Sequence, residues 1–145
     1  MNYEYADGIR AFMGQRQIPG CYNQNADYII GSKGFATIGV NHRQAVEITG
    51  EAAWHHTGPK NNMYQTEHDE LFASIRNGKP LNDGDRMTTS TMLAIMGRMA
   101  AYSGQEITWD QAINSQQKLV PEQMSWNMKL PIAPMAVPGQ TKFDF

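Results

Sequence analysis

The sequence predicts one α+β domain, in which a largely antiparallel, open-faced β-sheet is covered on one face by helices. Segments that alternate apolar and polar residues fill residues 1–60, and short turns join them. Strands connected in this way usually pair antiparallel. Helical spacing of apolar residues follows in residues 61–116, so the helices come after the strands. At 145 residues and 41% hydrophobic content, the chain is long enough to form one core.

The first predicted hairpin turns at Asp7-Gly8, a dipeptide typical of tight hairpin turns. Tyr3 and Tyr5 alternate with polar neighbours before this turn. The return strand runs from Ile9 towards Pro19-Gly20 and includes Arg16.

Two further pairs of strands are predicted. Residues 26–31 (ADYIIG) and 35–40 (FATIGV) flank Ser32-Lys33-Gly34, and the shorter segments 44–49 and 51–55 are separated by Gly50. Aromatic residues recur throughout this half of the chain, which argues against a sheet face that is wholly exposed to solvent.

The segment 63–115 contains the three predicted helices. In the first helix, apolar residues recur every three or four positions, Arg76 occupies the last turn and Gly78 follows as a stop signal. Residues 82–85 offer N-caps for a methionine-rich second helix, and Thr108 with Gln111 predicts a capping box for the third.

Residues 130–145 (LPIAPMAVPGQTKFDF) are predicted to form an extended arm. Three prolines within eight positions are incompatible with a helix or a central strand. The apolar residues of this arm would dock on a neighbouring surface, whereas the alternative is a disordered tail.

Charge and composition exclude several classes of partner. The net charge of −2 and the pI of about 6.0 give no electrostatic reason to expect nucleic acid. No apolar run approaches the roughly 20 residues needed to span a membrane. The first residues lack the apolar core of a secretory signal, and the single Cys21 fits a reducing compartment, so we expect a cytoplasmic protein.

No motif for phosphate or dinucleotide binding occurs, so no cofactor is expected to bind this chain alone. The histidines are His42, His55, His56 and His68. One hypothesis is a metal site formed by His68, either His55 or His56, and a carboxylate. The alternatives for His68 are a position at the edge of the core and a contact with a bound ligand. Arg16 could bind a carboxylate or sugar hydroxyls, or form an ion pair at the sheet edge.

An ordered set of segments resembles the C-terminal domain of the glucose–fructose oxidoreductase/inositol dehydrogenase/MocA (Gfo/Idh/MocA) family. The central segments are YQTEHDELFASIRNGKPLNDG and TSTMLAIMGRMAAYSGQEITWDQA. RQIPGCYN and IIGSKG precede them and PMAVPGQTKF follows them, so the resemblance covers nearly the whole chain.

The resemblance implies a two-domain enzyme that uses NAD(P), of which this chain corresponds to the second domain only. The Rossmann fingerprint is absent, and Gly78-Lys79-Pro80 only mimics the family's E-K-P segment with its catalytic lysine. The catalytic Asp/His pair of the family cannot be mapped here, so no catalytic residue is assigned. Tyr64, in the Y-x-x-E helix start, is expected to face substrate, and Arg16 and His68 are weaker assignments near the same cleft.

The leading hypothesis is therefore the substrate-binding and oligomerisation domain of a NAD(P)-dependent sugar or polyol oxidoreductase, inactive without a cofactor domain. We expect a second copy of the chain to bind through the open sheet face, which gives a dimer or a larger homo-oligomer. The other expected partners are a sugar or polyol and a separate Rossmann subunit. A free-standing binding or assembly module of the same fold is the alternative, and a histidine-based metalloenzyme ranks third.

Overall fold

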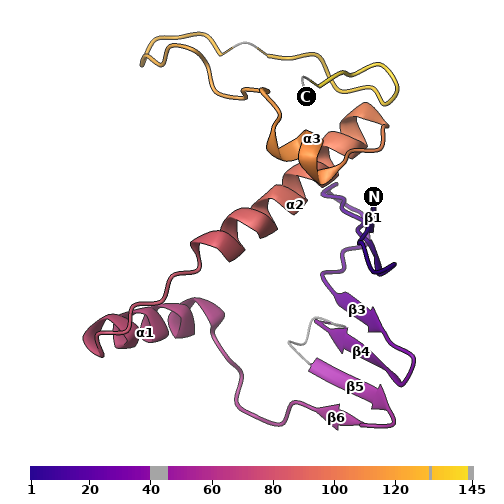
Figure 1. The fold of residues 1–145 in the computed structure, drawn as a ribbon, viewed down its shortest axis with the longest axis vertical. Helices are drawn as coiled ribbons and strands as arrows, with labels where there is room; N and C mark the ends of the chain where they lie inside the picture. Colours follow the sequence, from indigo (N-terminus) through magenta and orange to yellow (C-terminus); the bar gives the residue numbers. More distant parts are fainter. Residues whose placement is uncertain (40–45, 131, 144–145) are drawn as a thin grey trace. The chain divides into compact units, whose positions relative to one another are not determined.

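The described part of the chain forms three helices and two antiparallel β-sheets, which confirms the α+β class (Figure 1). The structure is a computed structural model, and it describes residues 1–39, 46–130 and 132–143. The fold divides into two compact units: Arg16–Leu81, and Met1–Gln15 together with Asn82–Phe145. We call them the sheet unit and the helix unit. In the described part of the chain, no helix is long and apolar enough to cross a membrane.

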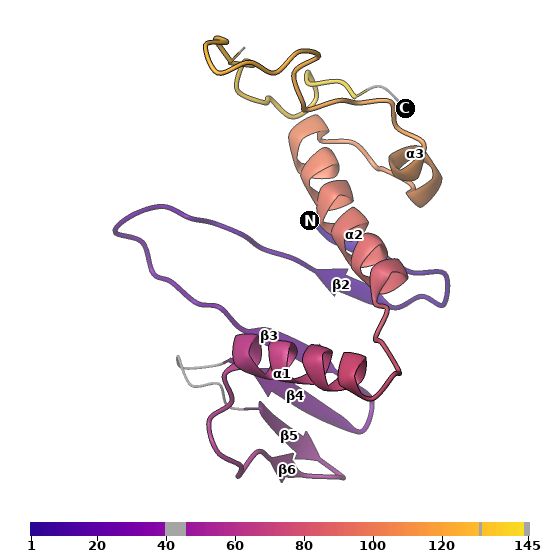
Figure 2. The ribbon, with the colours of Figure 1, turned by 90° about the vertical axis from the view of Figure 1, so that its left-hand side faces the viewer.

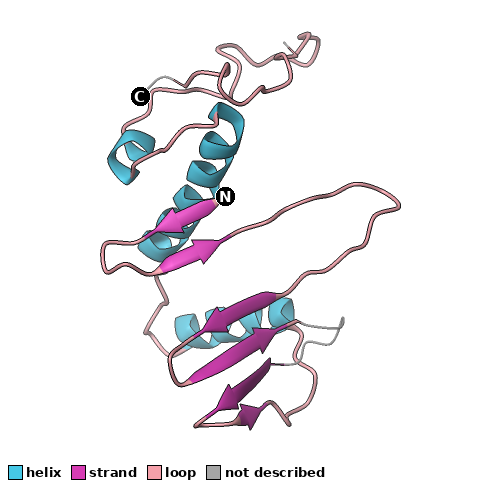
Figure 3. Ribbon diagram, turned by 90° about the vertical axis from the view of Figure 1, so that its right-hand side faces the viewer, coloured by secondary structure: helices cyan, strands magenta, loops and turns pink. Residues whose placement is uncertain are grey.

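The sheet unit contains a four-stranded antiparallel meander (Figure 3). Its strands are β3 (Asp27–Ile30), β4 (Gly34–Ile38), β5 (Val46–Gly50) and β6 (Trp54–His55), and each pairs with the next strand in the sequence. The two predicted pairs of strands are therefore present. Val40 and residues 41–45, which the sequence analysis placed partly in strands, lie outside the described residues.

The register aligns four apolar residues across the sheet: Ile29 is opposite Ala36, Ala36 opposite Ile48, and Ile48 opposite Trp54. Directly opposed residues lie on the same face, so these four form an apolar row. Ile29, Ile48 and Trp54 are nevertheless between 38% and 59% exposed. None of the described residues in the sheet unit is buried.

Helix α1 (Met63–Arg76) begins at Asn62, whose side-chain oxygen accepts hydrogen bonds from the backbone N–H groups of Tyr64 and Gln65. It ends near Gly78, which adopts the predicted left-handed conformation at φ +67°. No residue of α1 is buried, and Leu71, Phe72 and Ile75 are 40–55% exposed. Figures 1 and 2 show α1 standing on one side of strands β3–β6 without lying flat against them. The covering of the sheet by helices thus stays a prediction.

The helix unit combines a hairpin with two helices. Strand β1 (Asn2–Glu4) pairs with β2 (Arg10–Phe12) around the predicted Asp7-Gly8 turn. Helix α2 (Gly84–Ser103) ends at Gly104, which has φ +70°, and α3 (Trp109–Ile113) carries the predicted capping box. The buried apolar side chains of the described residues are Met99 and Ala112, which belong to α2 and α3.

The return strand of the first hairpin was predicted too long. Strand β2 ends at Phe12, so Arg16 lies outside it, in the sheet unit. Residues 14–26 have no partner strand among the described residues, and Gly14 and Pro19 are both unfavourable in strands.

The described residues of the predicted arm, 130 and 132–143, contain no helix or strand, but a turn closed by the 2.9 Å hydrogen bond from the Thr141 N–H to the Val137 carbonyl interrupts the extended path. The arm is attached near its end, where the Gly139 N–H donates to the Ser103 carbonyl at 2.6 Å. Gly104 packs closely there, because an added Cβ would lie 3.0 Å from Pro138.

Candidate functional site

A hollow of about 610 Å³ lies in the sheet unit, between one end of the sheet and the connection from β6 to α1. We call it the polar hollow. Its volume falls within the range typical of sites for small molecules. The described residues that line it are Asn25, Asp27, Ile38, Gly39, Val46, His56, Pro59, Lys60, Asn61 and Met63.

The strand register explains why residues distant in the sequence meet at this hollow. Asp27 is opposite Ile38, and Ile38 is opposite Val46. The His56 N–H donates to the Val46 carbonyl at 3.0 Å, which continues the same row beyond the end of β6. The sheet therefore contributes one carboxylate, two aliphatic side chains and one imidazole to one wall.

The opposite wall is formed by the chain just before α1. The Asn61 side-chain oxygen accepts a 2.6 Å hydrogen bond from the Thr66 hydroxyl, which ties this segment to the first turn of α1. A ring nitrogen of His56 lies 3.5 Å from the Pro59 carbonyl. Both walls are therefore linked to regular secondary structure.

Both hydrogen-bond acceptors and hydrogen-bond donors line the polar hollow. Asp27 supplies only acceptors at neutral pH, Lys60 supplies only donors, and Asn25 and Asn61 can supply both. Neither Asp27 nor Lys60 forms an ion pair with another described residue. With Ile38 and Val46 as an apolar wall, this set suits a small ligand that carries several hydroxyl groups.

The structure places Tyr64 and His68 on α1 and not among the residues that line the polar hollow. Tyr64 is 67% exposed. His68 Nδ1 lies 2.7 Å from the Tyr64 carbonyl, and because a carbonyl oxygen only accepts, Nδ1 must carry the proton in this contact. The other ring nitrogen, Nε2, takes no part in that contact.

Arg16 also lies away from the polar hollow. Its guanidinium donates a 3.0 Å hydrogen bond to the Tyr22 carbonyl and is exposed. It thereby closes the loop that follows the first hairpin. The structure therefore does not bring Arg16, Tyr64 and His68 together at this hollow, and their contacts with substrate stay predictions.

The described residues contain no group of three or more His, Cys, Asp or Glu side chains placed to hold a metal ion. His55 and His56 are adjacent at the end of β6, and His68 is on α1. His42 lies outside the described residues. Cys21 is exposed.

Sequence reasoning did not identify Asn25, Asp27, Lys60 or Asn61 as candidates for ligand binding. One signal was present, because the predicted pairing of residues 26–31 with 35–40 places Asp27 across from Ile38. Nothing in the local pattern indicated that residues 59–61 would return to that end of the sheet. Comparisons of this chain with protein-family models, with curated proteins and with solved structures give no match.

Proposed function

We propose that this chain is the substrate-binding and oligomerisation domain of a NAD(P)-dependent sugar or polyol oxidoreductase of the Gfo/Idh/MocA type. The observation that carries the proposal is the polar hollow, where Asp27 and Lys60 border an aliphatic wall. The order of the elements, with strands first and helices second, supports it because the resembling domain is an open-faced sheet backed by helices.

Sugars and polyols present rows of hydroxyl groups above a less polar carbon skeleton. A carboxylate accepts hydrogen bonds from two neighbouring hydroxyls, while an ammonium or amide group donates to others. Ile38 and Val46 would contact the carbon skeleton. The polar hollow therefore offers complementary groups to both parts of such a ligand.

Catalysis by this chain alone is not expected. Hydride transfer requires a nicotinamide held against the reacting carbon, and the protein contributes position and electrostatics. These 145 residues contain no dinucleotide-binding fingerprint, so a Rossmann domain outside this sequence, or a separate Rossmann subunit, would have to supply the oxidant. In that arrangement the polar hollow would hold the substrate for the cofactor domain.

Oligomerisation through the sheet is the second part of the proposal. In the apolar row, Ile29, Ile48 and Trp54 are exposed and Ala36 is half-buried, and an apolar surface of this kind is usually covered by a partner. The opposite face contributes Tyr28 and Phe35, whose rings stack with centroids 6.0 Å apart. Both faces of the sheet thus offer apolar contact area.

Titration calorimetry with a panel of sugars and polyols tests ligand binding. We expect binding by the natural chain and a loss of at least about tenfold in affinity for Asp27→Asn, because an ionised carboxylate forms stronger hydrogen bonds with hydroxyl groups than a neutral amide does. Glu51→Gln is the matched control, since Glu51 is exposed and lies at the other end of the sheet. Absence of binding to every member of the panel contradicts the proposal.

Nicotinamide reduction, followed by absorbance with the same panel, tests the second claim. We expect no turnover by the purified chain with NAD or NADP. Clear turnover would show that the chain binds cofactor by itself. It would contradict the proposal that this chain binds substrate while another domain binds the cofactor.

A free-standing assembly module is a second candidate. It is favoured by one observation: no described residue of the sheet unit is buried, so this unit has much surface to offer to partners. Calorimetry that shows no sugar binding, together with a mass measurement that shows a defined oligomer, would support this candidate over the first.

A further inference from the structure

The segment 116–136 forms a long loop of the helix unit, and we call it the C-terminal loop. It follows α3, which ends in the hydrogen bond from the Asn114 N–H to the Asp110 carbonyl at 3.2 Å. It returns to the end of α2, where Gly139 bonds to Ser103. Its described residues contain no helix or strand. Loops of this length without secondary structure are uncommon in compact domains and are often functional.

Seven of the large apolar side chains of the C-terminal loop are exposed to solvent, whereas Met128 is half-buried. Trp126 is completely exposed, at 104% of its reference area, and lies in a turn closed by the 3.3 Å hydrogen bond from the Met128 N–H to the Ser125 carbonyl. Six other apolar residues of the loop are 64–96% exposed: Leu119, Val120, Met124, Leu130, Ile132 and Met135. A fully exposed tryptophan at a turn is typical of an anchor residue for binding another protein.

The helix unit also contains a hollow whose lining suits an indole ring, and we call it the aromatic hollow. It has a volume of about 650 Å³ and lies between β1 and the α2–α3 region. Aromatic and thioether side chains contribute to its wall, among them Met1, Tyr3, Met96 and Trp109. Aromatic pairs and sulfur–aromatic contacts would favour an indole ring there.

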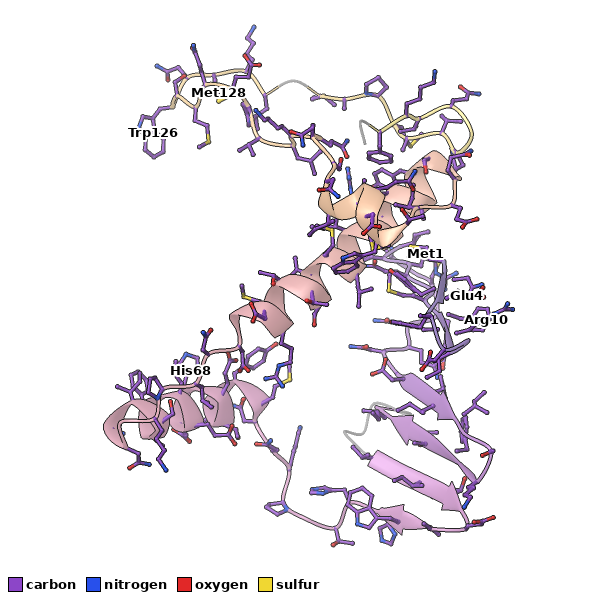
Figure 4. The ribbon with its side chains drawn as sticks, in the orientation of Figure 1. Met1, Glu4, Arg10, His68, Trp126 and Met128 are labelled. Carbon is purple, nitrogen blue, oxygen red and sulfur yellow. The ribbon has the colours of Figure 1, made fainter. Side chains whose placement is uncertain are left out.

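The loop of one chain does not fill its own aromatic hollow. Figure 4 shows Trp126 and Met128 at the outer end of the loop, well separated from Met1, which lines the hollow. Both belong to the helix unit. The attachment at α3 and at Ser103 holds the two ends of the loop at α2 and α3, while its turn projects away.

Charges on the two surfaces are complementary. The loop carries Lys118, Glu122 and Lys129, so its net charge is +1, and Lys129 is three positions from Trp126. Glu4 and Glu106 line the aromatic hollow. Glu4 lies 3.3 Å from Arg10, whereas Glu106 forms no ion pair with any other described residue. Glu106 is therefore the acidic group that is available to Lys129 of a second copy.

We propose that the C-terminal loop of one copy of this chain docks on the helix unit of a second copy, with Trp126 in the aromatic hollow and Lys129 beside Glu106. Because each copy carries one loop and one hollow, two equivalent contacts form and the assembly closes as a two-fold dimer. A buried tryptophan contributes about 150–250 Å² of contact area. With the six other apolar side chains, the loop can approach the roughly 800 Å² per partner of a stable interface.

This inference does not rest on the proposed enzymatic function, and it uses a different surface from the sheet. Sedimentation velocity over a range of protein concentrations tests it with the complete 145-residue chain. We expect a dimer at about 50 µM, within the micromolar range observed for weaker interfaces of standard size. Trp126→Ala should raise the dimer dissociation constant at least about tenfold, as is usual for an anchor residue.

Tyr22→Ala is the matched control, because Tyr22 is a large aromatic residue that is 79% exposed and lies in the sheet unit. It should leave the dissociation constant within about twofold of the natural value. Both substitutions remove exposed side chains, so neither should impair folding.

Charge reversal tests the partner contact itself. Lys129→Glu and Glu106→Lys should each weaken the dimer about twofold to fivefold, since exposed ion pairs contribute little individually. The double variant should regain the natural dissociation constant to within about twofold. Lys79→Glu is the control, because Lys79 is an exposed lysine of the sheet unit without an ion pair among the described residues.

A monomer at every concentration overturns the inference. The inference is also overturned if Trp126→Ala raises the dimer dissociation constant no more than Tyr22→Ala does. That result would still be compatible with association through the sheet. A double charge reversal that is no tighter than the single ones overturns the pairing of Lys129 with Glu106.

Discussion

The Tyr3 hydroxyl donates a 2.9 Å hydrogen bond to the main-chain carbonyl of Leu93, 90 positions later in the sequence. This bond attaches the β1–β2 hairpin to α2. Gly97 lies one helical turn after Leu93 and is buried against the same tyrosine, because an added Cβ would collide with the Tyr3 hydroxyl and lie 2.9 Å from the Met1 sulfur. The absence of a side chain at Gly97 thus permits the hairpin to approach the helix.

Gly97→Ala should destabilise the chain by about 1–3 kcal/mol, the usual cost of overpacking. At an exposed helix position the same substitution would stabilise the chain by about 1 kcal/mol. The sign of the change in the free energy of unfolding therefore distinguishes a packed Gly97 from an exposed one. Urea denaturation measures the free energy of unfolding. Gly14→Ala is the control, since an added Cβ there meets no atom within 4 Å. Tyr3→Phe should relieve part of the loss in the double variant, and a stabilising Gly97→Ala would contradict the docking of the hairpin.

Met99→Ala should cost about 2–5 kcal/mol, the range for removing a buried methionine side chain. Met99 is 2% exposed, and it is the largest fully buried side chain among the described residues. Met87, on the same helix, is 62% exposed, so Met87→Ala should change the free energy of unfolding by less than about 0.5 kcal/mol. Equal effects of the two substitutions, measured by urea denaturation, would show that the core does not lie at Met99.

Thr108→Ala should destabilise α3 by about 1 kcal/mol because it removes the N-cap. The Thr108 hydroxyl accepts from the Gln111 N–H at 3.2 Å, and the Gln111 side chain accepts from the Thr108 N–H at 2.9 Å. Amide hydrogen exchange at Ala112 is a suitable local measurement. Thr91→Ala is the control, since Thr91 is an exposed residue inside α2 and alanine is the better helix former. Unchanged exchange at Ala112 in Thr108→Ala would argue against the cap.

Two substitutions distinguish the polar hollow from the face of α1 as the sugar site. If the polar hollow binds the ligand, Asp27→Asn lowers the affinity measured by calorimetry and His68→Ala leaves it within about twofold. This is the expected result, because Asp27 lines the hollow and His68 does not. The reverse pattern would favour the assignment made from the family resemblance.

Local sequence signals predicted the secondary structure well. Asp7-Gly8 predicted the first hairpin, Gly78 the end of α1, and Thr108 with Gln111 the cap of α3. Each of these signals acts over a few residues, through a left-handed backbone conformation or a nearby hydrogen bond. Such interactions are set by the sequence itself, so they can be recognised in it.

The polar hollow could not be predicted in the same way. It forms because the connection after β6 returns residues 59–61 to the end of the sheet that carries Asp27. That return depends on the path of a connection without regular structure, which periodicity does not determine. Arg16 shows the same limit, because its assignment to a strand assumed that the alternation continued beyond Phe12.

The order of strand pairing has a consequence for the folding rate. Each described strand pairs only with strands that are next to it in the sequence, and the β3–β4 and β5–β6 connections are short. Isolated hairpins form in about 1–10 µs, and chains dominated by local contacts fold fast. The contact between Tyr3 and Leu93 instead requires the closure of a loop that includes the whole sheet unit. Attachment of the first hairpin to α2 should therefore be the late and slow step, and Tyr3→Phe should mainly accelerate unfolding.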